Sequence, residues 1–205
     1  MEQAALPTIF DIVGMAVFAI SGAVAAARER QTFVTVGFFA LITGVGGGSL
    51  RDVLIGAPVF WVGNAWAVPV CLVAALLVWF TPERWWNLRL LEWADALGLA
   101  AFATFGTIKA LSYGLPPGTA IVMGIVTGCA GGILRDVLAH QPSILMRPEL
   151  YVTAAALSSA LAAGCIALGM TAMAAGIAGT AAGFVLRGAA IRWSIALPAY
   201  GRKRD

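Results

Sequence analysis

Long apolar runs separated by short polar segments are the dominant pattern of this sequence. A membrane-spanning helix needs about 20 apolar residues, and seven runs of roughly this length follow one another along the chain. They cover residues 10–27, 34–50, 65–80, 96–113, 118–134, 150–169 and 171–191. A β-barrel would instead show segments of about ten residues with alternating polarity. The pattern therefore predicts an all-α membrane protein with seven transmembrane helices.

The composition agrees with a membrane protein and excludes a water-soluble enzyme. Of the 205 residues, 60% are hydrophobic and 11% are charged, whereas soluble domains carry about 25% charged residues. Seven spans of about 20 residues use roughly 140 positions, so no separate soluble domain fits. We expect a single transmembrane domain over residues 1–205, surrounded by the lipid bilayer and without a nucleic-acid partner.

Few residues are available for metal binding or acid–base chemistry. Cys71, Cys129 and Cys165 lie far apart in apolar runs, and His140 is the one histidine of the chain. Neither a disulfide framework nor a zinc site can be built from such a set. The sequence also has no HExxH motif and no GxSxG motif with a histidine partner. We therefore expect neither an enzyme nor a resident cofactor or metal.

The basic residues of the connections gather on one side of the predicted membrane. If successive connections alternate sides, ten basic residues share one side, and the opposite loops and the N-terminus have none. The ten are Arg28, Arg30, Arg84, Arg89, Arg147, Arg187, Arg192, Arg202, Lys203 and Arg204. Cytoplasmic loops are enriched in Lys and Arg. We expect a multi-pass protein of the inner (cell) membrane, with its N-terminus outside and a basic cytoplasmic tail at 192–205.

An internal repeat appears when the sequence is aligned with itself at an offset of 84 residues. GVGGGSLRDVLIGAP (44–58) then aligns with GCAGGILRDVLAHQP (128–142), and DIVGMAVFAISG (11–22) with DALGLAAFATFG (95–106). Each unit holds three predicted spans, and an odd number of crossings makes the second unit enter the membrane from the opposite face. The architecture expected is an inverted 3+3 repeat plus a seventh helix. Repeat one covers about 8–80, repeat two about 92–169 and the seventh helix about 171–191.

A glycine cluster lies in the second predicted helix and another at the matching place in the fifth. The candidate pore residues are Gly44, Gly46, Gly47, Gly48 and Ser49 in the first, and Gly128, Gly131 and Gly132 in the second. Glycine costs about 1 kcal/mol in a helix interior, so the clusters predict a kink or a short unwound stretch. Carbonyls freed there need protein partners or a water-filled path, and such a path suits cations. The alternative is close helix packing, which a single cluster would favour, whereas matching clusters in two halves favour a pore.

A Leu-Arg-Asp-Val-Leu segment follows each glycine cluster. Adjacent helical residues do not face each other, so we expect each arginine to find its partner on another helix. The candidates are two aspartates that precede the arginines by 40 residues and that we expect to begin their helices. The charge-pair set is Asp11, Arg51 and Asp52 in one repeat and Asp95, Arg135 and Asp136 in the other. In the alternative interpretation, the aspartates are N-caps and the arginines extend to the membrane surface.

Lys109 is the one lysine inside a predicted span, and its repeat equivalent is Ala25. An ionisable residue within the membrane is by default a candidate functional residue. Lys109 is therefore a candidate gate or charge filter. The alternative is that its side chain extends to the outer interface.

The doubled GG-x-LRDVL-x-x-x-P motif in a seven-helix chain of this length resembles the prokaryotic branch of the trimeric intracellular cation channels. The resemblance covers essentially the whole chain, and members of this family are also labelled glycine transporters. It implies a homotrimer with one pore per subunit, conducting potassium and sodium and lined by glycine-kinked helices two and five. It also implies kinks at Gly46 to Gly48 and at Gly131 to Gly132, and a gating role for Lys109. Ala130 replaces the first of these glycines in the second cluster, so the two kinks need not be equal.

Two functions therefore remain open. A passive channel for monovalent cations is favoured by the symmetric glycine clusters, by the small number of buried polar residues and by the resemblance. A secondary transporter for a small solute such as glycine is favoured by the inverted repeat, which many transporters share.

Overall fold

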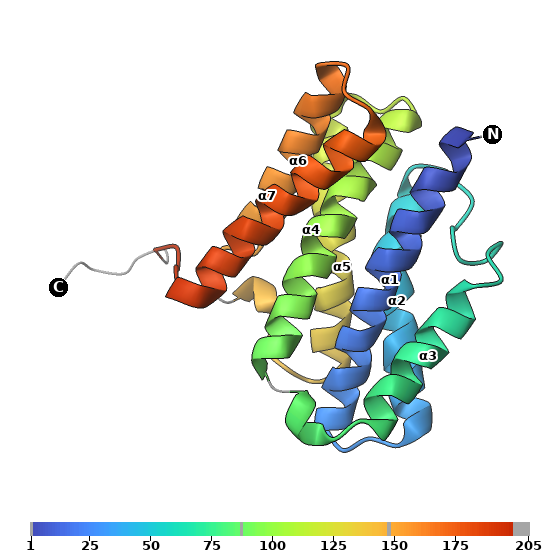
Figure 1. Ribbon diagram of the computed structural model, residues 1–205, viewed down its shortest axis with the longest axis vertical. Helices are drawn as coiled ribbons and strands as arrows, with labels where there is room; N and C mark the ends of the chain where they lie inside the picture. The colour runs from blue at the N-terminus through green and yellow to red at the C-terminus, as the bar shows by residue number, and fades with distance from the viewer. Residues whose placement is uncertain (1, 87, 147–148, 199–205) are drawn as a thin grey trace.

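The computed structural model describes residues 2–86, 88–146 and 149–198 (Figure 1). Within these ranges the chain forms seven long α-helices and two short 3-10 helices. They are α1 (Glu2–Arg28), α2 (Phe33–Leu54), α3 (Ala67–Phe80), η1 (Glu83–Trp85), α4 (Leu88–Ser112), α5 (Pro117–Leu138), η2 (Ile144–Met146), α6 (Val152–Ala167) and α7 (Ala172–Trp193). Each predicted apolar run corresponds to one α-helix, so the all-α prediction is confirmed. Arg147 and residues 202–204, which entered the predicted orientation, lie outside the described residues.

The third helix of each repeat is shorter than the others. α1, α2, α4, α5 and α7 contain stretches long and apolar enough to cross a membrane. α3 and α6 have 14 and 16 residues, which makes them about 21 and 24 Å long, against a hydrocarbon core of about 30 Å. The expectation of seven full-length spans is thus corrected to five long and two short apolar helices. The two short helices occupy equivalent places in the two repeats.

The two groups of three helices, α1–α3 and α4–α6, run in opposite directions. In Figure 1, α1 descends from the N-terminus, whereas α4 begins at the lower end and ascends beside it. Their contacts are reciprocal, because Phe102 fills the space beside Gly14 and Phe18 fills the space beside Gly98. These two pairs are related by the offset of 84 residues with the repeats exchanged. An inverted arrangement requires such an exchange.

The ends of the helices recur at the same offset. α1 and α4 are followed by residues with positive φ, Arg30 at 53° and Gly114 at 80°. α2 and α5 are followed by Gly56 at 69° and His140 at 52°. At each of these positions the chain turns back and its N–H groups bond the last carbonyls of the helix. The repeat therefore extends from the sequence to the backbone conformation of the turns.

α7 lies outside the two repeats and packs against α4 and α6. Arg28 and Glu92 line one cavity, and Arg89 and Arg192 line another. The C-terminal ends of α1 and α7 therefore lie at the same end of the bundle as the start of α4. We call this end the basic end. This clustering is the one on which the predicted orientation depends.

Candidate functional site

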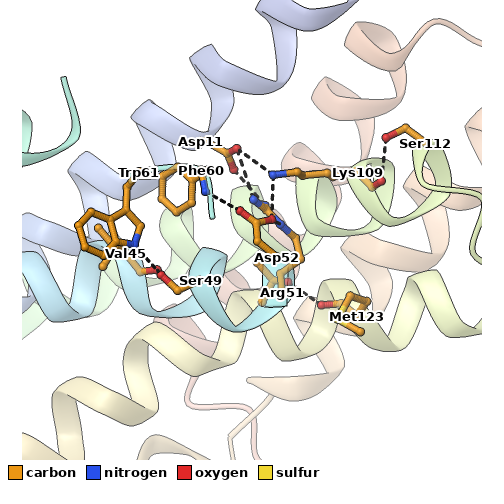
Figure 2. A network of polar contacts seen from close by, with 11 residues as sticks. Asp11, Val45, Ser49, Arg51, Asp52, Phe60, Trp61, Lys109, Ser112 and Met123 are labelled. Carbon is orange, nitrogen blue, oxygen red and sulfur yellow. Dashed lines mark hydrogen bonds and ion pairs between the residues drawn. The ribbon is translucent and has the colours of Figure 1, made fainter. Parts of the chain in front are cut away.

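Four charged side chains from three helices form charge cluster one, which consists of Asp11, Arg51, Asp52 and Lys109 (Figure 2). Arg51 donates from Nη1 to Asp11 Oδ1 at 3.0 Å and from Nε to Asp52 Oδ1 at 2.8 Å. Lys109 Nζ lies 2.8 Å from the same Asp52 oxygen and 4.0 Å from Asp11 Oδ2. The Arg51 side chain is fully buried. Two cations balance two carboxylates, and the cluster ties α1, α2 and α4 together.

The chain that follows α2 folds back over this cluster. Asp52 Oδ2 accepts a hydrogen bond from the backbone N–H of Phe60 at 2.8 Å. Trp61 Nε1 donates to Ser49 Oγ at 2.8 Å, and Ser49 donates to the carbonyl of Val45 at 2.7 Å. Ser49, a predicted pore residue, therefore anchors the loop between α2 and α3, as Figure 2 shows.

The equivalent charges of the second repeat form charge cluster two, which consists of Asp95, Arg135 and Asp136. Arg135 donates from Nη1 to Asp95 Oδ1 and to Ser21 Oγ, and from Nε to Asp136 Oδ1 at 2.9 Å. Asp136 Oδ2 accepts from the backbone N–H of Ile144 at 2.8 Å. This bond repeats the one that closes the loop after α2, because Ile144 is the equivalent of the residue used there. Cluster two lies toward the basic end and joins α1, α4 and α5.

The two clusters differ in one charge. Cluster one has the ammonium group of Lys109, whereas the equivalent position beside cluster two is Ala25. Cluster two therefore has one cation against two carboxylates and carries a net negative charge. Asp95 Oδ2 is buried and has no hydrogen-bond partner among the described residues. The equivalent oxygen of Asp11 accepts from Arg51 Nη2 at 3.4 Å.

Two expectations about these charges are wrong in the structure. In both clusters the arginine binds the adjacent aspartate as well as the distant one, because its long side chain bends around the helix to reach the neighbouring carboxylate. Asp11 and Asp95 do not begin helices, since α1 starts at Glu2 and α4 at Leu88. The N-cap interpretation therefore does not apply. The distant partners at a separation of 40 residues are those that the sequence suggested.

Neither glycine cluster contains an unwound stretch, because α2 and α5 are α-helical throughout. A Cβ on Gly47 would overlap the carbonyl oxygen of Thr127, and a Cβ on Gly131 would lie 3.0 Å from that of Thr43. These contacts are again reciprocal at the offset of 84 residues. The expectation of an unwound stretch with freed carbonyls is therefore wrong. The glycines instead let the backbones of α2 and α5 approach closely.

The other glycines of the clusters face neighbouring elements of their own or the opposite repeat. A Cβ on Gly44 would meet the carbonyl oxygen of Met15 at 3.0 Å, and a Cβ on Gly128 would meet that of Leu99 at 2.8 Å. Side chains fill the space beside the remaining three, with Leu134 beside Gly46, Phe60 beside Gly48 and Tyr151 beside Gly132. The clusters thus occupy crowded positions at which larger side chains do not fit.

Each charge cluster borders a cavity. A cavity of about 530 Å³ is lined by Asp11 and Lys109, together with the loop before α3. A smaller one of about 160 Å³ is lined by Asp95 and the other residues of cluster two. Along α1 and α4, the rings of Phe18 and Phe102 lie between the two clusters, fully buried and with centroids 5.2 Å apart. The bundle therefore has a charged cavity toward each end and an apolar middle.

Comparison with known proteins identifies the family. The profile of a family described as "Glycine transporter" matches the chain twice, at residues 8–83 and 92–167. The two matches are offset by 84 residues, as the internal repeat requires. A UPF0126 membrane protein of Vibrio cholerae is 37% identical over 94% of this chain and 82% of its own length. The UPF0126 inner membrane protein YadS of Escherichia coli is 37% identical over 93% of this chain and 94% of its own length.

Solved structures relate the same fold to ion channels. A TRIC trimeric intracellular cation channel orthologue from Rhodobacter sphaeroides is 36% identical, with a TM-score of 0.85 over 93% of this chain and 99% of that one. The chain belongs to the prokaryotic TRIC family. A prokaryotic TRIC channel crystallised in 0.5 M KCl has a TM-score of 0.86 at 25% identity, over 95% of this chain and 100% of that one. The names of the relatives also agree with a multi-pass membrane protein of the inner membrane.

One buried charge in this TRIC family member was not recognised from the sequence. Arg187 was counted among the basic loop residues, but it lies inside α7 and its side chain is 1% exposed. It forms an ion pair with Glu149 Oε2 at 2.6 Å, and its guanidinium lies over the ring of Tyr151 at 5.3 Å. Its place in the last apolar run, two turns before the helix ends, was the one signal available. The contact fastens α7 to the segment that precedes α6.

Proposed function

We propose that this protein is a channel for monovalent cations that conducts potassium and sodium. The observation that carries the proposal is the likeness to the Rhodobacter sphaeroides TRIC channel, at 36% identity over almost the entire length of both chains. Similarity at this level extends to the loops and charge clusters that surround the bundle, and not only to its helices. The apolar interior, with few polar groups that could bind a solute, supports a channel further.

The conduction path proposed runs along α2 and α5, between the two charged cavities. Carboxylates border both cavities, and acidic groups at a pore mouth attract cations. The path is closed in this conformation, because Gly47 and Gly131 hold the two helices in backbone contact and the rings of Phe18 and Phe102 pack together. Opening therefore requires α2 and α5 to separate, and the glycines allow this because no interlocked side chains need to disengage.

We also propose a homotrimer with the basic end in the cytoplasm and the N-terminus outside. The solved relatives are named trimeric channels, and an exposed apolar groove of about 330 Å³ runs between α1, α4 and α7. The clustering of Arg28, Arg89 and Arg192 at one end supports the orientation. Each subunit would then contain its own α2 and α5, and therefore its own path.

A secondary transporter for glycine or a similar small solute is the second candidate. It is favoured by the description of the family profile and by the reciprocal contacts between the repeats, since many transporters bind their substrate at such an interface. The carboxylates of cluster two would then receive the ammonium group of the solute. This mechanism predicts saturable uptake and exchange, which a passive channel does not show.

A flux experiment separates the two candidates. The purified protein is reconstituted into liposomes loaded with potassium chloride, and the potassium efflux is followed after dilution into choline chloride. A channel releases potassium without glycine on either side, and a proton ionophore accelerates the release because it relieves the charge that builds up. Uptake of labelled glycine with counterflow, and no potassium release, would instead establish the transporter.

A further inference from the structure

We propose that charge cluster two binds a monovalent cation in the position that the ammonium group of Lys109 occupies in cluster one. The meaning of this site for conduction rests on the proposed channel function, but the binding can be measured without any current. The cation would complete the charge balance of cluster two, as the lysine does for cluster one.

The first argument is the equivalence of the two clusters. Lys109 Nζ approaches two oxygens, Asp52 Oδ1 at 2.8 Å and Asp11 Oδ2 at 4.0 Å. At the offset of 84 residues these oxygens correspond to Asp136 Oδ1 and Asp95 Oδ2. The arginine, the adjacent aspartate and the backbone N–H that closes the loop all recur in cluster two. The lysine is the one charged member that does not.

The second argument is the carboxylate oxygen that lacks a partner. Asp95 is 1% exposed, and its Oδ2 has no hydrogen-bond partner among the described residues. A buried charged group without a partner is costly. The side chain at the lysine position is the methyl group of Ala25, which can neutralise nothing. The oxygen without a partner is thus the equivalent of the Asp11 oxygen that faces Lys109.

The third argument is space and access. The cavity of about 160 Å³ at this end is lined by Ala25, Asp95 and Asp136, so the place of the missing ammonium is open. Glu29 and Glu92 also line it, against Arg28 and Arg135, which gives four carboxylates and two guanidinium groups. Glu29 accepts a hydrogen bond from Gln141 at 3.1 Å and is otherwise exposed. A cavity lined mainly by acidic groups raises the local concentration of cations.

The chemistry of the site favours a monovalent ion. Arg135 already neutralises part of the charge of the two carboxylates, so one further positive charge is sufficient. The described residues contain no group of three or more His, Cys, Asp or Glu side chains that could hold a metal ion, and a divalent ion would need such a set. The hydroxyl of Tyr151 lies close to the Asp95 carboxylate and is also without a partner among the described residues, so a neutral oxygen is available beside the charged ones.

The test is the thermal stability of the purified protein as a function of potassium. Potassium chloride replaces N-methylglucamine chloride at constant ionic strength, because the large organic cation does not fit the cavity. We expect a saturable rise of the Tm with potassium for the natural protein. Asp95→Asn should lose this rise. Ala25→Lys should lose it as well, and its Tm without potassium should reach the value that the natural protein reaches at saturation.

Lys109→Ala is the matched control at the other cluster, because it removes the ammonium group and leaves Asp52 and Asp11 in the state proposed for cluster two. We expect a larger potassium-dependent rise of the Tm in this variant than in the natural protein. If Ala25→Lys does not fold, Asp95→Asn and Lys109→Ala decide the question. Equal Tm values in potassium and N-methylglucamine, or a full potassium response in Asp95→Asn, would overturn the proposal.

Two further outcomes separate this proposal from others. A Tm rise with glycine at fixed N-methylglucamine, and none with potassium, would assign the position to the ammonium group of a solute and contradict an inorganic cation. Potassium-dependent stability in a protein that passes no current would leave the binding site in place and remove the channel function. Current without potassium-dependent stability would do the reverse.

Discussion

Lys109 of α4 and Asp52 of α2 form an ion pair at 2.8 Å across the two repeats. The pair joins the C-terminal ends of two helices that have no other charge contact with each other in cluster one. The Asp52 carboxylate is fully buried, and the lysine side chain is 14% exposed toward the adjacent cavity. Lys109 thus lies between the cavity and the end of a helix that must move for the proposed path to open.

The first prediction concerns this lysine. Lys109→Ala removes both the link between α4 and α2 and a positive charge at the cavity, so we expect a higher open probability or a larger unitary conductance. Lys109→Arg keeps the charge and should behave more like the natural protein. Single-channel recording from trimers purified by size-exclusion chromatography measures the effect. Unchanged currents in Lys109→Ala would limit the residue to a structural role.

The second prediction concerns the buried pair of Arg51 and Asp11. Removing one partner of a buried ion pair leaves an uncompensated charge and costs about 3–5 kcal/mol, so Arg51→Ala should lower the Tm markedly. Asp11→Ala should also be destabilising. The double variant should lose less stability than the sum of the two single variants, because neither charge is then left without its partner. Strictly additive losses would contradict a direct interaction.

The third prediction concerns the contact between α2 and α5. Gly47→Ala places a methyl group against the carbonyl oxygen of Thr127, so the helices must separate and the Tm should fall, by an amount typical of overpacking, about 1–3 kcal/mol. Gly37→Ala on the same helix is the matched control, since nothing lies within 4 Å of its Cβ position. This control should leave stability unchanged or raise it slightly, because Ala favours the helix by about 1 kcal/mol. Equal effects at the two positions would argue against the tight crossing.

The fourth prediction concerns orientation in the membrane. In a variant without its three buried cysteines, a single cysteine at Gly63 or Gly118 should react with an impermeant maleimide added outside intact cells. A cysteine at Arg84 should react only after the membrane is opened, because it lies at the basic end. All three positions are exposed. Labelling of Gly63 and Arg84 from the same side would contradict the proposed topology.

The helices and their pairing were largely predictable from the sequence, because apolar runs and an internal repeat are properties of the chain itself. The repeat also indicated the partners of the two arginines, since equivalent residues in two copies must make equivalent contacts. The RDV segments were expected near the ends of their helices, and α2 and α5 indeed continue through them to Leu54 and Leu138. The charges do not end the helices because they are neutralised in pairs inside the protein.

Other features could not be predicted because they depend on packing between distant segments. Glycine clusters are compatible both with an unwound helix and with a close crossing, and only the position of the opposing Thr127 carbonyl distinguishes them. The partner of Lys109 depends on how the repeats dock, which the sequence offset alone does not define. Arg187 was expected near the cytoplasmic interface, but the segment around Tyr151 covers it. In each case the deciding atom belongs to a remote part of the chain.

The most direct test of the proposed function is the reversal potential of the purified protein in a planar bilayer under a gradient of potassium chloride. A cation-selective pore should give unitary currents that reverse near the potassium equilibrium potential, about 59 mV for a tenfold activity gradient, without any glycine present. Replacing potassium with sodium should preserve the currents. Reversal near the chloride potential, or the absence of unitary currents from correctly assembled protein, would contradict the assignment as a monovalent-cation channel.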